Sequence, residues 1–295
     1  MSATGSRPHV DEVTIRKARP EDAAACGRIC YVAFGTINAA HGFSHEMPSE
    51  EAAVGLLTKA FSHPGFWCVV AEQDGRIVGS NCMDERSVVF GIGPITVDPK
   101  VQNHGVGRRL MEAVLDRSRK RHAPAVRLLQ AAFHNRSLSL YTKLGFDPRE
   151  PMSVMQGQPL GFSIDGCAVR PAIMSDLDAA NRVCQLVHGH SRSGELSDAI
   201  THGTALVVER EGRITGYVTG FGYFAHGAGE CNLDLQALIA AADSFGGPGM
   251  IVPTRNAALF RWCLEKGLRV IQPLTLMTMG MYNEPQGAYL PSILY

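Results

Sequence analysis

The chain of 295 residues lacks an excess of either charge, because 28 lysine and arginine residues balance 28 aspartate and glutamate residues. Without a positive field, the sequence favours neither a nucleic acid nor a membrane surface as a partner, and we predict neither. It also lacks a signal peptide and a long apolar run, which predicts a cytoplasmic protein. Its eight cysteines form no Cys-x-x-Cys pair, so we expect reduced thiols and no metal site.

What is present suits two ordinary globular domains. Hydrophobic residues make up 45% of the chain and charged residues 19%, which allows buried cores and a polar surface. A chain of this length is long for one domain and comfortable for two of about 150 residues each. Residues 1–10 are polar, and we expect them to be frayed.

The most informative stretch runs from Ile95 to Leu110 and reads ITVDPKVQNHGVGRRL. The β-rich residues before it predict a buried strand that ends at Asp98. Apolar residues then recur at the spacing of one helix face: Val106, Leu110, Ala113 and Val114. Gly105 and Gly107 therefore lie at a helix start, where unpaired N–H groups and the helix dipole favour an anion such as a phosphate.

The pattern Gln-x-x-Gly-x-Gly from Gln102 to Gly107 resembles the pyrophosphate-binding motif of the GNAT acyl-CoA N-acyltransferases. A second segment, residues 135–146, is similar to that family's Asn, Tyr and Gly-Phe stretch, with the spacing intact. A Rossmann dinucleotide site fits worse because the third glycine of its motif is missing. A Walker loop is excluded because Gly-Lys-Ser/Thr is absent.

The resemblance implies an enzyme that binds acetyl-CoA and an amine together and transfers the acetyl group directly. Backbone amides of the glycine loop, with Arg108, would hold the pyrophosphate. The main chain of Ile95 and Val97 would pair with the pantetheine arm and the thioester carbonyl, and Asn135, assisted by Ser137, would bond the same arm. The full predicted set for the cofactor is Ile95, Val97, Gln102, Asn103, His104, Gly105, Val106, Gly107, Arg108, Asn135, Ser137 and Tyr141.

Tyr141 is the side chain that we assign to proton transfer. Its phenol, with a pKa of about 10, could protonate a leaving thiolate whose conjugate acid has a pKa of about 8.5. On spacing alone this tyrosine could equally pack with its hydroxyl satisfied locally. The family pattern favours the catalytic role.

The general base stays open at this point. A primary alkyl amine has a pKa of about 10.4, so its deprotonation at pH 7 costs about 4.6 kcal/mol and calls for an acceptor. Five residues are candidates by position: His41, His45, Glu46, Asp84 and Glu85. Each taken alone is more often a solvated loop residue, and the segment from Gly35 to Pro48 is expected to be irregular.

The resemblance also implies the element order β-α-α-β-β-β-α-β-α-β, with Met152–Met155 in the strand that closes the unit. After a turn-rich linker the chain starts again, and residues 209–216 (EREGRITG) repeat residues 72–79 (EQDGRIVG). We therefore predict an α/β (α+β) class with two tandem GNAT folds, each a mixed, mostly antiparallel central sheet flanked by helices. The predicted parts are an acetyltransferase domain at 11–157, a linker at 158–166 and a GNAT-like domain at 167–295.

The second copy is shorter where the phosphate loop would lie, and it carries Glu230 and Asp234 there. Two carboxylates would repel a pyrophosphate, so we predict a degenerate domain that does not bind acyl-CoA in the usual way. In the loop after its first helix, His188, His190 and Arg192 are expected to be solvated. The apolar tail, residues 277–295, is expected to pack on the body, at the acceptor pocket or at an interface.

The sequence thus predicts an acetyl-CoA-dependent N-acetyltransferase that acts on a primary amine of a small molecule. One alternative is a non-catalytic acyl-CoA sensor or scaffold, and another is an acyltransferase that uses a longer acyl-CoA. An acidic bias suggests a cationic acceptor; its residues are Glu46, Glu50, Glu51, Asp84 and Glu85. A homodimer and the identity of the acceptor stay open.

Overall fold

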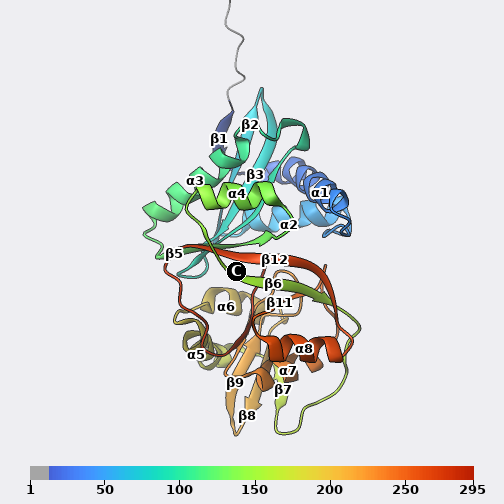
Figure 1. Ribbon diagram of the computed structural model, residues 1–295. Helices are drawn as coiled ribbons and strands as arrows, with labels where there is room; N and C mark the ends of the chain where they lie inside the picture. Colours follow the sequence, from blue (N-terminus) through green and yellow to red (C-terminus); the bar gives the residue numbers. More distant parts are fainter. Residues whose placement is uncertain (1–12) are drawn as a thin grey trace, which may run out of the picture.

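The structure is a computed structural model that describes residues 13–295, so the expected fraying of residues 1–10 and the first residues of the predicted 11–157 domain lie outside it. Figure 1 shows two lobes, one above the other, with strands at their junction. The first half contains β1 (Thr14–Lys17), η1 (Pro20–Asp22), α1 (Ala23–Ala40), α2 (Glu50–Ser62), β2 (Phe66–Gln73), β3 (Arg76–Asp84), β4 (Phe90–Val97), η2 (Pro99–Val101), α3 (Val106–Lys120), β5 (Ala125–Ala131), α4 (Asn135–Lys143) and β6 (Asp147–Gln156).

The second half largely repeats this order, and its first two helices, α5 and α6, are shorter than α1 and α2. It contains β7 (Ala168–Pro171), η3 (Met174–Asp176), α5 (Leu177–His188), α6 (Ser193–Thr201), β8 (Leu206–Arg210), β9 (Arg213–Val218), β10 (Gly227–Gly229), α7 (Asn232–Ala240), β11 (Met250–Pro253), α8 (Ala257–Glu265), β12 (Arg269–Gly280) and β13 (Ala288–Leu290). All strand pairs but that of β4 with β5 are antiparallel, and helices cover the sheets. The predicted α/β (α+β) class with mostly antiparallel sheets is confirmed.

The same ion-pair trio occurs in both halves, and its aspartate is buried in each. Arg16 binds Asp22 and Glu72, and Arg170 binds Asp176 and Glu209. A register shift also precedes the glutamate in each half, after Ala71 in one and after Val208 in the other. Because ion-pair geometry and strand irregularity recur at matching positions, the halves are structural repeats, as the sequence repeat indicated.

The two halves exchange one strand each, β6 and β12. The eight-stranded sheet has the order β1-β2-β3-β4-β5-β12-β6-β11, so β12 of the second half lies between β5 and β6. The expected closing of the first unit by Met152–Met155 therefore needs correction, because this strand pairs with β12 and β11, both from the second half. Strand order depends on contacts far apart in the sequence, which a local pattern does not encode.

Helix α1 is longer than the sequence suggested. The segment after Gly35 was expected to be irregular, but the helix continues to Ala40. A β-carbon on Gly35 would lie 2.6 Å from Nε2 of His45, so the glycine permits close packing of the following loop instead of ending the helix. The added turns carry Thr36 and Ile37 to the cavity described below.

The exchanged strands share one core across the junction. Leu274 and Leu276 of β12 are 1% exposed and cluster with Met152, Val154 and Leu129 of the first half. Apolar burial of this kind contributes about 25 cal/mol per Å². The two halves should therefore unfold together.

We expect Leu276→Ala to lower the free energy of unfolding by about 2–5 kcal/mol, because it removes a fully buried leucine from the shared core. Chemical denaturation followed by circular dichroism measures this. Val270→Ala, on the same strand but 46% exposed, is the matched control and should change stability by less than about 1 kcal/mol. Two separate transitions in the wild-type protein would contradict the shared core.

Candidate active site

A cavity of about 810 Å³ opens where β4 and β5 diverge. The two strands pair in parallel only at Phe90 and Gly91, although β4 continues to Val97. The edge of β4 that faces β5 therefore carries backbone groups without a strand partner over Ile92–Val97. Such an edge can hydrogen-bond an extended ligand as a further strand would.

The start of α3 borders the same cavity and has no side-chain cap. Gly105 occupies the N-cap with a φ of 84°, a left-handed conformation that favours glycine. A β-carbon there would meet no atom within 4 Å, and one on Gly107 would make only ordinary contacts at 3.7 Å and beyond. Free space and uncapped N–H groups fit a phosphate, so the residues present suit the diphosphate of a coenzyme.

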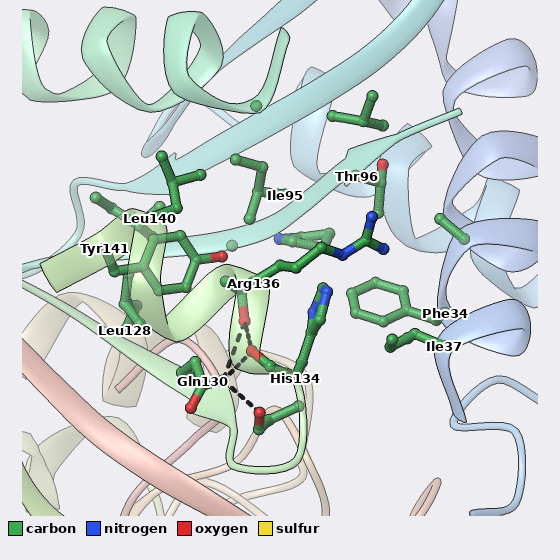
Figure 2. Close-up of a pocket in the computed structure, with 18 of the residues that line it drawn as sticks. Phe34, Ile37, Ile95, Thr96, Leu128, Gln130, His134, Arg136, Leu140 and Tyr141 are labelled. Carbon is green, nitrogen blue, oxygen red and sulfur yellow. Dashed lines mark hydrogen bonds between the residues drawn. The ribbon is translucent and has the colours of Figure 1, made fainter. Parts of the chain in front are cut away.

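Hydrogen bonds that the sequence did not predict hold the loop before α3, at Gln102 and Asn103. Arg136 on α4 donates to Oε1 of Gln102 at 2.9 Å and to Oδ1 of Asn103 at 3.1 Å. Gln102 in turn donates to the carbonyl of Val97 at 3.1 Å. Figure 2 shows Arg136 extending across the pocket. With Arg108, it gives this end of the cavity a positive charge.

The structure brings the predicted cofactor residues together, with one exception. Those that line the cavity are Ile95, Val97, Gln102, Asn103, Gly105, Val106, Gly107, Arg108, Asn135, Ser137 and Tyr141. His104 does not; it is exposed, with its Nδ1 3.4 Å from the carbonyl of Val101. The Ser137 hydroxyl donates to the carbonyl of His134 at 2.9 Å, so its proton is already engaged.

Tyr141 is buried beside Phe146, and its hydroxyl points into the cavity (Figure 2). Within residues 13–295, no protein group hydrogen-bonds this hydroxyl, so the local satisfaction that would make it a packing residue is not seen there. Burial raises the pKa of Tyr141, which keeps the phenol protonated at neutral pH. The group can therefore act as a proton donor.

Two polar residues of the cavity wall were missed by sequence reasoning. Gln130, 2% exposed, donates to the carbonyl of His134 and to Oγ of Ser137, each at 3.0 Å, and so fixes the start of α4. Burial, with the nearby Arg136 guanidinium, lowers the pKa of His134 to about 4, so this imidazole is neutral. Neither residue belongs to a motif, and only the loop geometry identifies them.

Glu46 is the base candidate that reaches the cavity. Its Oε1 accepts a hydrogen bond from Nε2 of Gln272, on β12, at 3.1 Å. Burial raises the pKa of Glu46, while the Gln272 donor opposes that rise. A carboxylate of raised pKa that faces a cavity suits proton transfer near neutral pH.

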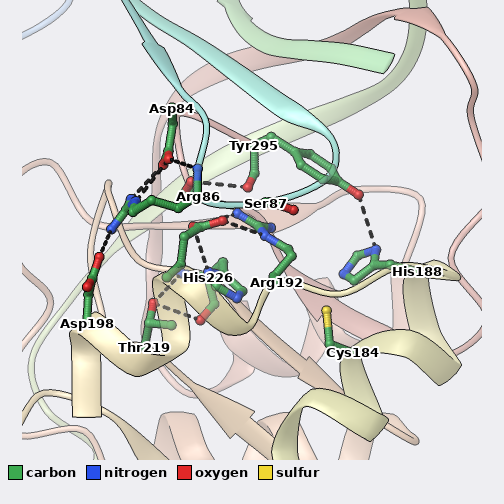
Figure 3. Close-up of polar contacts among 12 residues, drawn as sticks. Asp84, Arg86, Ser87, Cys184, His188, Arg192, Asp198, Thr219, His226 and Tyr295 are labelled. Atoms are coloured by element: carbon green, nitrogen blue, oxygen red, sulfur yellow. Dashed lines mark hydrogen bonds and ion pairs between the residues drawn. The ribbon is translucent and has the colours of Figure 1, made fainter. Parts of the chain in front are cut away.

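The other candidates are engaged elsewhere. Asp84 binds Arg86 (Figure 3), and Glu85 binds Arg117. The His45 ring contacts the backbone of Tyr31 and Met47. His41 is exposed and packs against Phe133. The acidic bias noted in the sequence therefore does not describe the cavity, because only Glu46 of that group lines it.

The loop residues His188, His190 and Arg192 are buried, which corrects the expectation that they are solvated. Arg192 is 2% exposed and binds Glu195 through two bonds of 2.8–2.9 Å. The guanidinium of Arg192 lies 4.7 Å from the centre of the Tyr295 ring. The Tyr295 hydroxyl lies 3.3 Å from Nδ1 of His188 (Figure 3). The tail and the first half cover this loop, so local sequence could not reveal its burial.

The corresponding groove of the second half is filled. Strand β13 pairs with β10 from Gly227 to Gly229, where β4 of the first half has an open edge. Asp234 occupies the first turn of helix α7, the counterpart of α3. Its carboxylate accepts a hydrogen bond from the N–H of Cys231 at 3.0 Å and binds Arg210. Glu230 pairs with Arg213. Both predicted carboxylates thus lie at this helix start and leave no cradle for an anion.

Two other features are absent from the part of the chain that the structure describes. Between residues 13 and 295, no group of three or more His, Cys, Asp or Glu residues could hold a metal ion. In the same part of the chain, no helix combines the length and apolarity needed to cross a membrane.

Comparisons agree with this geometry. Residues 36–146 match the profile of the acetyltransferase (GNAT) family. No curated protein sequence matches the chain. Solved structures that resemble it include a provisionally assigned acetyltransferase from Pyrococcus horikoshii, with a TM-score of 0.74, 16% identity and 98% coverage of both chains.

Two further structures share the fold over most of the chain. A GCN5-related N-acetyltransferase from Sphaerobacter thermophilus has a TM-score of 0.61 and 17% identity, with 92% of this chain and 96% of that chain covered. A tandem GNAT protein from the clavulanic acid biosynthesis pathway has a TM-score of 0.55 and 11% identity, with 91% and 98% covered. At these identities the likeness concerns the fold. Residues 36–146 therefore belong to the acetyltransferase (GNAT) family, within a chain that has a tandem GNAT fold.

Proposed function

We propose that this chain is an acetyl-CoA-dependent N-acetyltransferase that moves an acetyl group to the primary amine of a small molecule. One observation carries the proposal: the uncapped, glycine-opened start of α3 lies in the same cavity as the unpaired edge of β4. The first feature suits a diphosphate and the second suits the extended amide arm of the same coenzyme. The second half has neither feature, so we place acyl-CoA binding in the first half.

The residues divide the binding work along the cavity. Backbone N–H groups from Gly105 to Gly107, with Arg108, would hold the diphosphate. The main chain of Ile95 and Val97 would bond the pantetheine arm and polarise the thioester carbonyl, whose oxygen gains negative charge during attack. Asn135, at the start of α4, would bond the same arm from the opposite wall.

Two side chains would move protons. The amine nitrogen attacks the thioester carbon, a C–N bond forms and the C–S bond breaks. Glu46 accepts the proton that the nitrogen loses, directly or through water. Tyr141 donates its proton to the departing sulfur.

We expect Tyr141→Phe to lower kcat about 10²-fold while the KM for acetyl-CoA stays nearly unchanged, because the ring still packs but the proton is lost. Thiol release in the presence of an amine measures this. Tyr31→Phe, on α1 and outside the cavity lining, is the matched control and should keep its activity. A near-normal rate for Tyr141→Phe would make this tyrosine a packing residue.

A pH profile tests Glu46. Only the ionised carboxylate accepts a proton, and burial raises its pKa, so kcat/KM should fall as the pH drops through that raised pKa. Glu46→Gln should lower kcat/KM by about 10²-fold and remove this acid limb. If the limb persists unchanged in Glu46→Gln, another group is the base.

Gly107→Asp tests the diphosphate site. Aspartate suits the first turn of a helix, so folding should persist, but its charge would oppose the diphosphate. We expect the Kd for CoA to rise by at least about 10-fold, measured by calorimetry. Gly55→Asp adds the same charge at an exposed position of α2, outside the cavity lining, and should leave the Kd unchanged. Equal affinities in both variants would contradict this site.

A further inference from the structure

The cavity has two chemically different ends. The end near α3 and α4 is basic and carries Arg108 and Lys143, and Arg136 reaches from α4 across the pocket (Figure 2). The other end lies between α1 and the second half, and its wall is apolar: Phe34, Ile37, Met47, Phe224, Ile293 and Leu294. Among the residues that the structure describes, Glu46 is the only carboxylate in the lining. If the proposed function holds and the coenzyme takes the basic end, the apolar end is left for the acceptor.

The second half builds a large part of this apolar wall, and the wall is firmly held. The N–H of Ile293 donates to the carbonyl of Tyr223 at 2.7 Å, which joins the tail to the loop between β9 and β10. Leu294 packs so closely on Gly91 of β4 that a β-carbon there would lie 2.0 Å from the Leu294 carbonyl oxygen. The tail is thus part of the pocket, one of the two places that the sequence left open for it.

The second half also holds the carboxylate. Gln272 is 1% exposed, and its Nε2 donates to Oε1 of Glu46 and to the hydroxyl of Tyr223, each at 3.1 Å. Both N–H bonds of this amide are therefore used, which fixes its direction. Because a hydrogen bond to the charged form favours that form, Gln272 keeps Glu46 available as an acceptor.

The other occupant to consider for the apolar end is a long acyl chain. Glu46 argues against it, because a hydrocarbon chain would desolvate this carboxylate further without adding a partner to the Gln272 donor that it already has, which is costly. An ammonium or amine group would satisfy the same carboxylate. A single carboxylate matches a single amine, whereas a polyamine or an aminoglycoside would place further polar groups against hydrocarbon.

We propose that the second half is the acceptor-binding half of a composite site, and that the acceptor is a monoamine with an apolar body about the size of an aromatic ring. The body lies against Phe34 and Phe224, and the nitrogen faces Glu46. This inference rests on the proposed function.

The full-length protein is assayed for amine-dependent thiol release with 2-phenylethylamine, ethanolamine, 1,4-diaminobutane and an aminoglycoside. We expect kcat/KM for 2-phenylethylamine to exceed the others by about 30- to 100-fold, because only its ring gains from the apolar wall. Phe224→Ser should raise the KM for 2-phenylethylamine about 5- to 10-fold, and the protein should still fold because this residue is 42% exposed. The KM values for ethanolamine and acetyl-CoA should not change. Leu233→Ser, at a similarly exposed leucine on α7, is the control and should behave as wild type.

Gln272→Met tests the positioning role of this amide. Without the Gln272 donor the pKa of Glu46 should rise further, so the acid limb of kcat/KM should move to higher pH by about half a unit or more. A merely structural role would lower stability or rate without moving the limb, and that result would reject this part of the inference.

Either of two outcomes would contradict an apolar monoamine as the acceptor. One is a preference for 1,4-diaminobutane or the aminoglycoside, and the other is an equal effect of Phe224→Ser on every amine. Faster transfer from hexanoyl-CoA than from acetyl-CoA, with no dependence on amine size, would assign the apolar end to the acyl chain. Calorimetry of 2-phenylethylamine in the presence of CoA distinguishes a failure of the proposed function from a failure of the acceptor inference. Binding without thiol release rejects the proposed function but keeps the acceptor site. If 2-phenylethylamine neither binds nor causes thiol release, the acceptor class is rejected.

Discussion

The insertion of β12 between β5 and β6 is the constraint on which the rest of the structure depends. It places strands of both halves in one eight-stranded sheet, beside the five-stranded sheet of the second half, and gives the halves a common core. Without it, β5 and β6 would each present an unpaired edge, which proteins avoid. The same strand carries Gln272 to the wall of the cavity, so the contact that stabilises the junction also places the donor that holds Glu46.

The two repeats contain equivalent grooves, of which one is open and the other is filled. In the first half, β4 and β5 diverge and the groove between them opens beside Gly105. In the second, β13 occupies the equivalent edge and Asp234 closes the helix start. A chain that fills one groove with its own tail can use the same tail, through Ile293 and Leu294, to wall the other. In our proposal this explains how a copy without a coenzyme site contributes to the reaction.

The end of the cavity that we propose for the coenzyme could be predicted from sequence, while the end that we propose for the acceptor could not. Residues 95–146 carry local signals: a strand, a glycine turn with its required backbone conformation, and a helix with a periodic apolar face. The acceptor end is assembled from α1, the loop that holds Glu46, β12 and the tail, which lie far apart in the chain. Position alone therefore left five candidates for the general base. Gly35 suggested the end of a helix, whereas in the structure it allows close packing against His45.

By itself the sequence determined the class of fold, the repeat and the glycine-opened start of α3, because periodicity and glycine conformation act over a few residues. The tertiary structure alone decided which strands pair, since β12 meets β5 across more than a hundred residues of chain. It also decided that His188, His190 and Arg192 are buried, because burial depends on what packs over a loop and not on the loop's own composition. Pairing and burial are non-local, and both govern how the acceptor end of the cavity is built.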